Sequence, residues 1–153
     1  MSDDYDWRTG RTCVFKTFYH LVFVPKYRRD VFTDAMLLRL DEVFRETCAQ
    51  MDGELIEFNG EADHVHLLVV CPPKQSLSNF VGKLKGKSAH VLRREFEVEV
   101  KKKLWGEQFW SPSYCAVSCG GAPLEVVAQY IKDQQRPPTK QGAEHSQKIR
   151  KQL

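Results

Sequence analysis

Residues 54–71 read ELIEFNGEADHVHLLVVC, and this stretch decides the fold. The segment ELIEFNG is typical of a short strand, and Asn59-Gly60 predicts a turn into a second strand, HVHLLVVC, which Pro72-Pro73 ends. Alternate side chains of a strand point to opposite faces, so His64 and His66 share one face of the second strand. The other face carries the apolar residues Val65, Leu67, Val69 and Cys71. The stretch therefore predicts a hairpin with an apolar face and a face that begins with two histidines.

The chain before this hairpin predicts one strand and one helix. Residues 14–24 are rich in aromatic and β-branched residues and predict a long strand that Pro25 ends. From Asp34 to Met51, apolar residues recur three and four positions apart, which predicts an amphipathic helix that ends near Gly53.

The chain after the hairpin predicts a helix, a strand and a last helix. Ser76 can cap the first helix, in which apolar side chains from Leu77 to Leu92 leave the lysines on the opposite side. A basic connector leads to a strand over residues 109–117, where Pro112 indicates an edge position or a bulge. The last helix follows the joint Gly120-Gly121 and runs from Pro123 to Gln135. The order predicts an α+β fold, a ferredoxin-like βαββαβ split sheet with an added C-terminal helix.

Length and composition indicate one soluble domain. The 153 residues fit a domain over residues 13–136, between a flexible lead-in (1–12) and a basic, disordered tail (137–153). The chain is 42% hydrophobic and 28% charged, and it lacks the run of ~20 apolar residues that spans a bilayer. The acidic N-terminus is unlike a signal peptide, so we expect a cytoplasmic protein whose five cysteines are thiols.

Positive charge is concentrated in one segment. Residues 83–103 contain eight basic and three acidic residues, a net charge of +5; the whole chain carries +3, so the remainder sums to −2. This distribution suits a polyanion, although a lysine-rich helix often presents only a solvated face. The candidate polyanion-binding residues are Lys83, Lys85, Lys87, Arg93 and Arg94.

The two histidines of the second hairpin strand are candidate metal ligands. Residues i and i+2 of a strand have Cα atoms ~6.5–7 Å apart on one face, so the imidazoles of His64 and His66 can reach one ion. Taken alone, such a pair is more often one structural and one exposed histidine. The apolar residues on the opposite face of the strand favour the metal site.

The last helix carries a second candidate pair, Tyr130 and Gln134. They stand four residues apart and share a helix face beside the apolar stripe of Leu124, Val127 and Ile131. A tyrosine at the edge of the core and a solvated glutamine would give the same pattern. The alternative is that the carbonyl oxygen of Gln134 is a third metal ligand, which would place the Tyr130 hydroxyl one helical turn from the metal.

Several motifs together resemble the single-tyrosine HUH transposases of small bacterial and archaeal insertion sequences and their domesticated relatives. The resemblance covers about residues 14–135 and rests on YHLVFVPKYR (19–28), DHVHLL (63–68), LKG (84–86), LWG (104–106), FWSPSY (109–114) and QYI (129–131). Where that family often has a proline before the aspartate of DHVH, this chain has Ala62, and its basic tail is longer.

The resemblance implies roles for the candidate residues. His64 and His66 are the metal ligands, Gln134 completes the triad, and Tyr130 is the nucleophile that forms a 5′-phosphotyrosine with DNA. Mg²⁺ or Mn²⁺ suits imidazole and amide ligands. The implied partner is a single-stranded DNA hairpin near an element end, bound by a homodimer whose sites are shared between subunits. No nucleotide-binding loop is required for this chemistry, and none occurs in the sequence.

Other readings stay open at this point. A domesticated relative could nick chromosomal palindromes by the same chemistry, and a protein without catalysis could only bind DNA hairpins. A zinc site could use Cys115 and Cys119, although one Cys-x3-Cys without a second pair is weak support.

Overall fold

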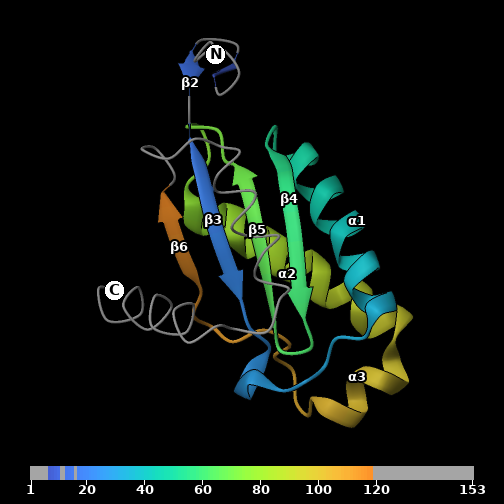
Figure 1. Ribbon diagram of the computed structural model, residues 1–153. Helices are drawn as coiled ribbons and strands as arrows, with labels where there is room; N and C mark the ends of the chain where they lie inside the picture. Colours follow the sequence, from blue (N-terminus) through green and yellow to red (C-terminus); the bar gives the residue numbers. More distant parts are fainter. Residues whose placement is uncertain (1–6, 11–12, 16, 119–153) are drawn as a thin grey trace, which may run out of the picture.

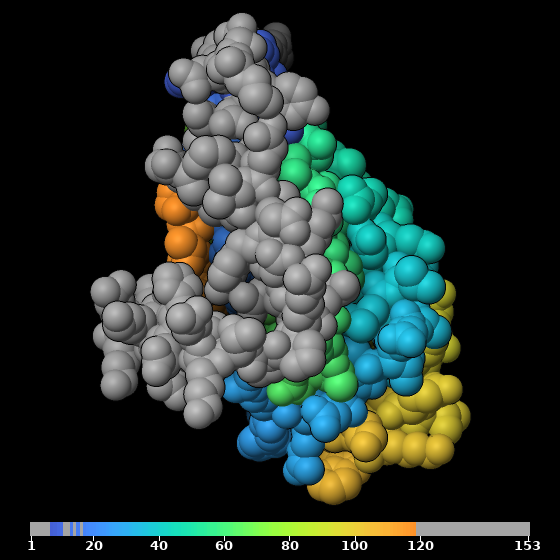
Figure 2. Space-filling model, in the orientation of Figure 1, coloured from blue at the N-terminus to red at the C-terminus, as the bar shows by residue number. Residues whose placement is uncertain are grey.

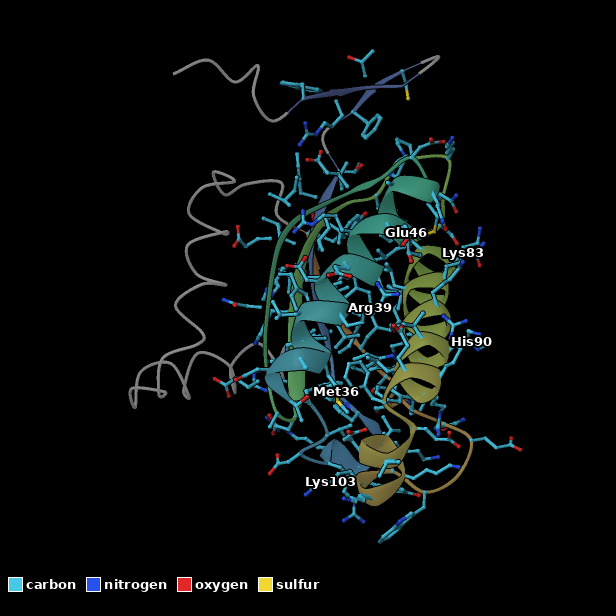
Figure 3. All side chains as sticks on the ribbon, turned by 90° about the vertical axis from the view of Figure 1, so that its right-hand side faces the viewer. Met36, Arg39, Glu46, Lys83, His90 and Lys103 are labelled. Atoms are coloured by element: carbon cyan, nitrogen blue, oxygen red, sulfur yellow. The ribbon has the colours of Figure 1, made fainter. Side chains whose placement is uncertain are left out.

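The computed structural model describes residues 7–10, 13–15 and 17–118. Its main sheet has four antiparallel strands in the order β4-β5-β3-β6. In chain order they are β3 (Phe18–Phe23), β4 (Glu54–Glu61), β5 (His64–Val70) and β6 (Cys115–Ser118). Helices α1 (Asp34–Gln50) and α2 (Leu77–Glu95) cover one face of this sheet (Figure 1 and Figure 3). The βαββαβ order and the α+β fold predicted from the sequence are confirmed.

Shorter elements lie around this unit. A separate two-stranded sheet pairs β1 (Arg8–Thr9) with β2 (Val14–Phe15). A 3-10 turn, η2 (Lys26–Arg28), follows β3, and a short helix, α3 (Glu97–Lys103), follows α2. None of the helices in the described part of the chain has the length and apolar character that a membrane span requires.

The inner face of the sheet packs against both helices. Leu21 and Phe23 of β3 and Val65, Leu67 and Val69 of β5 are fully buried in one cluster with apolar side chains of α1 and α2. The helices start as predicted, because the side chains of Thr33 and Ser76 accept hydrogen bonds from the backbone N–H groups of Met36 and Asn79. Apolar burial on this face fixes which side of each strand points away from the helices.

The strand register assembles the outer face. In antiparallel pairs, residues directly opposite each other share a face. Val22 of β3 lies opposite His66 of β5, and His20 lies opposite Leu68. On the other side of β5, Asn59 and Glu61 of β4 lie opposite His66 and His64. The face away from the helices therefore carries three histidines from the two central strands, His20, His64 and His66.

The predicted turn at Asn59-Gly60 is wrong. Both residues continue β4, where they pair with His66 and Val65, and the chain turns at Ala62-Asp63. Gly60 serves close packing instead, since a Cβ atom there would lie 2.6 Å from Leu37 Cδ2 on α1 and 3.0 Å from Val65 Cγ1. The Asn-Gly pair resembled a turn because both a turn and a close approach favour glycine.

Three predicted boundaries also differ. The long strand over 14–24 is two strands, because β2 pairs with β1 and only β3 joins the main sheet. The basic connector contains α3, in which Lys101 pairs with Glu97 one turn earlier. In the strand expected over 109–117, only Cys115–Ser118 is a strand, with one bridge between Trp110 and Pro25. Phe109 and Trp110 are both buried, which the alternation of a regular strand does not allow at one sheet face.

Candidate metal centre

Strand β5 brings His64 and His66 together on the outer face of the sheet. Their ring centroids lie 4.9 Å apart with the rings edge to face. His66 is buried, and the side chain of His64 retains 17% of its exposure. The i, i+2 spacing predicted from the sequence therefore yields two adjacent imidazoles on a rigid central strand.

The ring of His64 is oriented by the preceding residue. His64 Nδ1 lies 2.7 Å from Asp63 Oδ1, and Arg28 Nε donates to the other carboxylate oxygen over 3.2 Å. Burial alone would raise the pKa of Asp63, but its hydrogen bond with His64 and the nearby Arg28 outweigh burial and lower it. Asp63 is thus a carboxylate that engages Nδ1 and leaves Nε2 of His64 as the ring nitrogen for a ligand.

The ring of His66 is oriented by a third histidine. His66 Nδ1 lies 3.1 Å from His20 Nε2, and the two rings stack with centroids 5.3 Å apart. Burial lowers the pKa of His20 to about 4, and burial together with the neighbouring histidines lowers the pKa of His66 to about 3. Both rings are therefore neutral at physiological pH, which is the form of imidazole that binds metals.

The second ring nitrogen of His66 indicates whether a metal ion fits between the two histidines. His66 Nε2 is buried and has no hydrogen-bond partner among the described residues. An unsatisfied buried nitrogen costs about 1–3 kcal/mol, so natural folds seldom keep one without a use. Among the described residues both Nδ1 atoms are engaged and neither Nε2 atom has a hydrogen-bond partner, so the pair fits a divalent cation. One ligand atom each from Glu61, Asp63 and His64 also lie within 4.8 Å of one another, so carboxylate oxygens are close by.

Comparison with known proteins shows the family to which the chain belongs. The family model described as "Transposase IS200 like" matches residues 13–134. The chain belongs to the IS200-like transposase family. The ISDra2 transposase TnpA of Deinococcus radiodurans is 36% identical over 131 residues, which cover 84% of this chain and 91% of that protein. The IS200 transposase of Salmonella typhimurium is 37% identical over 116 residues, 76% of this chain and 75% of that protein.

Solved structures show the same relationship. A crystal structure of a candidate transposase from Deinococcus radiodurans matches with a TM-score of 0.64 at 32% identity, covering 83% of this chain and 97% of that one. A REP-associated tyrosine transposase bound to a REP hairpin matches with a TM-score of 0.54 over 81% of this chain and 67% of that one. At 10% identity, that second likeness shows a shared fold only. The family membership expected from the sequence motifs is confirmed.

Three of the other predicted site residues cannot be placed, because they lie outside the part of the chain that the structure describes. Tyr130 and Gln134, the expected nucleophile and third ligand, lie outside the described residues, as does Cys119 of the alternative zinc site. The cluster of candidate ligands found in the described chain contains no cysteine.

The predicted DNA-binding residues lie on α2, on the opposite side of the sheet from the histidines. Lys83, Lys87 and Arg94 are exposed, and Figure 3 shows Lys83 on the side of α2 that faces away from the sheet. Lys85 Nζ instead donates to the carbonyl oxygens of Ser111 (2.7 Å) and Ser113 (3.1 Å), and burial lowers its pKa.

Arg93 is also engaged within the transposase. Its guanidinium donates to the carbonyl oxygens of Gly106 and Glu107, both over 3.1 Å. Lys85 and Arg93 therefore hold the segment between α3 and β6 against α2. Among the five predicted residues, only the three exposed ones have charges that this packing leaves available.

Three residues that orient the histidines, His20, Arg28 and Asp63, were given no role in the sequence analysis, although Asp63 belongs to the DHVHLL motif. A signal for His20 was present, because it has the same parity in β3 as the outward residues and lies within the YHLVFV motif. Arg28 ends the same motif, YHLVFVPKYR, but the motif did not indicate its role, since its contact with Asp63 depends on the path of the chain after β3.

Proposed function

We propose that this transposase cleaves and rejoins single-stranded DNA at hairpin-marked element ends through a covalent bond to Tyr130, at a divalent metal held by His64 and His66. The observation that carries the proposal is the buried Nε2 of His66, which has no hydrogen-bond partner among the described residues and lies beside the ring of His64. The REP-associated relative bound to a REP hairpin supports a hairpin substrate.

The chemistry follows from the residue types. The Tyr130 oxygen attacks a backbone phosphorus, a new P–O bond forms to the tyrosine, and the bond to the 3′ oxygen breaks to release a 3′-hydroxyl. The tyrosine proton passes to solvent or a neighbouring base. Rejoining reverses these steps with a different 3′-hydroxyl, so the phosphodiester energy is kept. The bound Mg²⁺ or Mn²⁺ would supply Lewis-acid stabilisation and orientation of the scissile phosphate.

The residues of the site have separate roles in this proposal. His64 and His66 hold the ion, with Gln134 as the third ligand. Asp63 and His20 fix the two imidazole rings by hydrogen bonds to their Nδ1 atoms. Because all three protein ligands are neutral, the ion should bind weakly until a DNA phosphate adds negative charge. Lys83, Lys87 and Arg94 would bind backbone phosphates along the exposed face of α2.

The test is a covalent adduct. The full chain is incubated with Mn²⁺ or Mg²⁺ and a labelled single strand that contains an element end, and the products are separated under denaturing conditions. We expect a labelled protein band that disappears with EDTA and in Tyr130→Phe, while Tyr130→Phe still shifts the hairpin in a native gel. Hairpin binding without any adduct in the unaltered protein would contradict the proposal and favour a DNA-binding protein without catalysis.

A homodimer with shared sites is part of the same proposal. If Tyr130 of one subunit acts beside His64 and His66 of the other, a heterodimer of Tyr130→Phe with a His64→Ala, His66→Ala chain contains one intact site. Mixing the two inactive variants should then restore cleavage. Continued inactivity after subunit exchange has been demonstrated would show that each tyrosine serves its own histidines.

A further inference from the structure

A groove lies at one end of the molecule, between the chain that follows β3 and the end of α3. It has a volume of about 410 Å³ and is lined by Arg28, Arg29, Asp30, Lys102, Lys103 and Trp105. The space-filling view shows these two segments side by side, the blue segment before α1 against the yellow and orange segment around α3 (Figure 2). Residues about 75 positions apart in sequence thus form one surface.

The lining is strongly basic, and most of its charge is not neutralised. Four cations face one carboxylate, Asp30, which gives +4 − 1 = +3 for the lining. Within the Lys101–Lys103 run, Lys101 pairs with Glu97 over 2.5 Å, whereas neither Lys102 nor Lys103 forms an ion pair with any described residue. Unpaired cations gathered in a concave surface favour a polyanion over scattered solvent ions.

The groove also presents an aromatic ring to solvent. Trp105 is 73% exposed, which is unusual for the largest apolar side chain of a soluble domain. The guanidinium of Arg29 lies over this ring, 5.3 Å from its centroid. A phosphate-binding cation and a ring on which a base can stack are therefore adjacent, the combination that single-stranded nucleic acids bind.

The groove is connected to the histidine site through Arg28. Arg28 lines the groove, and its Nε donates to Asp63, which in turn engages Nδ1 of His64. Tyr27 and Arg28 both have left-handed backbone conformations, with φ of 60° and 51°. A left-handed backbone conformation costs about 1–3 kcal/mol in a residue other than glycine, and such residues cluster at functional sites. Here they turn Arg28 toward Asp63.

We propose that this groove binds unpaired DNA that leads to or from the histidine site, with backbone phosphates on Arg29, Lys102 and Lys103 and a base stacked on Trp105. The inference rests on the proposed function, in that it names where the substrate strand runs beyond the metal site. Unpaired DNA is specified rather than a duplex stem, because stacking on Trp105 requires a base that is free of its partner.

The test measures binding without cleavage. The Tyr130→Phe chain, with Trp7→Phe added to remove the other exposed tryptophan, is titrated without metal using an unpaired deoxythymidine oligomer of about 12 nucleotides. Fluorescence should be quenched on binding, because Trp105 is exposed while Trp110 is buried. Trp105→Ala should abolish the quench and weaken binding about tenfold, as measured by anisotropy of a labelled oligomer.

Charge is tested with a matched control on the same helix. Lys102→Ala with Lys103→Ala should lower the slope of log affinity against log salt by about 1.4, at ~0.7 for each lost phosphate contact. Lys101→Ala, an exposed lysine already paired with Glu97, should leave the slope nearly unchanged. Three results would each contradict the proposed binding of unpaired DNA in this groove. They are an equal change of slope in Lys101→Ala and in the Lys102→Ala, Lys103→Ala variant, an unchanged affinity in Trp105→Ala, and binding of a blunt duplex stem but not of the oligomer.

The failure of the groove and that of the proposed function are distinguishable. If the unaltered protein forms no adduct but Trp105→Ala loses oligomer binding, the covalent mechanism is wrong and the proposal that the groove binds unpaired DNA is supported. If the adduct forms but the oligomer binds Trp105→Ala as well as it binds the parent chain, the proposed role of the groove is wrong and the covalent mechanism is supported. Circular dichroism checks that the Trp105→Ala chain is folded, and the lysine variants provide an independent test with surface residues only.

Discussion

The polar side chains of Ser88 and His66 are both buried, on opposite sides of the central sheet. They differ in whether their polar atoms have hydrogen-bond partners. On the helix side, Ser88 Oγ lies 2.7 Å from the carbonyl oxygen of Leu84 and 3.0 Å from that of Lys85, and it accepts from Trp110 Nε1 over 3.0 Å. On the other side, His66 Nε2 has no partner in the part of the chain that the structure describes. On the helix side the polar atoms of Ser88 are satisfied within the fold, whereas on the histidine side one buried nitrogen has no partner among the described residues, which is the atom that our proposal assigns to a metal.

Removing His66 should have the largest effect, and it should fall on activity. Lewis-acid stabilisation by a metal contributes several kcal/mol, and each 1.36 kcal/mol is a factor of ten, so His66→Ala should lower the cleavage rate about 1,000-fold or more. Mn²⁺ should raise the unfolding midpoint of the unaltered protein and have no such effect on the variant. Cleavage assays and thermal unfolding with and without Mn²⁺ measure both outcomes.

The matched control is His90→Ala. His90 is exposed on α2 and points away from the sheet, as Figure 3 shows. Its removal should change neither the cleavage rate nor the response to Mn²⁺. An equal loss in His66→Ala and His90→Ala, or full cleavage in His66→Ala, would show that His66 does not hold a catalytic metal.

The next residue of β5 should behave in the opposite way. Leu67 is fully buried on the helix side, and Leu67→Ala should lower the free energy of unfolding by about 2–5 kcal/mol through lost burial and a cavity. The protein that remains folded should still bind Mn²⁺. Urea denaturation measures the change, and Leu38→Ala is the control, because Leu38 is 70% exposed on α1. A smaller effect of Leu67→Ala than of Leu38→Ala would show that the assigned faces of β5 are wrong.

The sequence could predict this two-sided strand because alternation is a local property. Apolar residues recur every second position in residues 64–71, and those of the neighbouring helices recur with a period near 3.6. The core face and the histidine face of the strand could therefore both be predicted from the sequence. The caps Thr33 and Ser76 are local in the same sense, although only Ser76 was predicted. These features depend on residues within one or two turns of each other.

Features that depend on distant packing could not be predicted. Gly60 looked like part of a turn, but its role is set by Leu37, which approaches from α1. Lys85 looked like a phosphate contact, but the chain near Ser111 and Ser113 returns to cover it. His20 becomes a partner of His66 only through the β3–β5 register. In each case the deciding neighbour is far away in sequence, so spacing carries no information about it.

Removing His20 should produce a smaller loss on the histidine side than removing His66. His20 Nε2 engages His66 Nδ1, so His20→Ala should free the His66 ring and lower metal affinity about 10- to 100-fold. At saturating Mn²⁺, cleavage should return close to the rate of the unaltered protein, because His20 positions a ligand and is not itself one. Titration of cleavage against Mn²⁺ separates the two effects. His20→Gln, which keeps a hydrogen-bonding side chain, should recover part of the affinity, and a rate that stays low at every Mn²⁺ concentration would argue against a positioning role.

The smallest effect should appear in the hydrogen bond between Trp110 and Ser88 on the helix side. Ser88→Ala leaves Trp110 Nε1 buried without its acceptor, and Trp110→Phe removes the donor and part of a ring that packs against Phe23 and Phe44. Each single variant therefore loses more than the bond itself, and only a double-mutant cycle isolates it. We expect a coupling of about 0.5–1.5 kcal/mol in the free energy of unfolding, the net value of a neutral hydrogen bond, measured by urea denaturation of the four proteins. Adding Mn²⁺ should leave this coupling unchanged, because the pair lies on the opposite side of the sheet from His64 and His66. A coupling that changed with Mn²⁺ would mean that the two sides of the sheet are not independent. The hydrogen-bonded Ser88 and the unpaired nitrogen of His66 would then belong to one connected network instead of two separate faces.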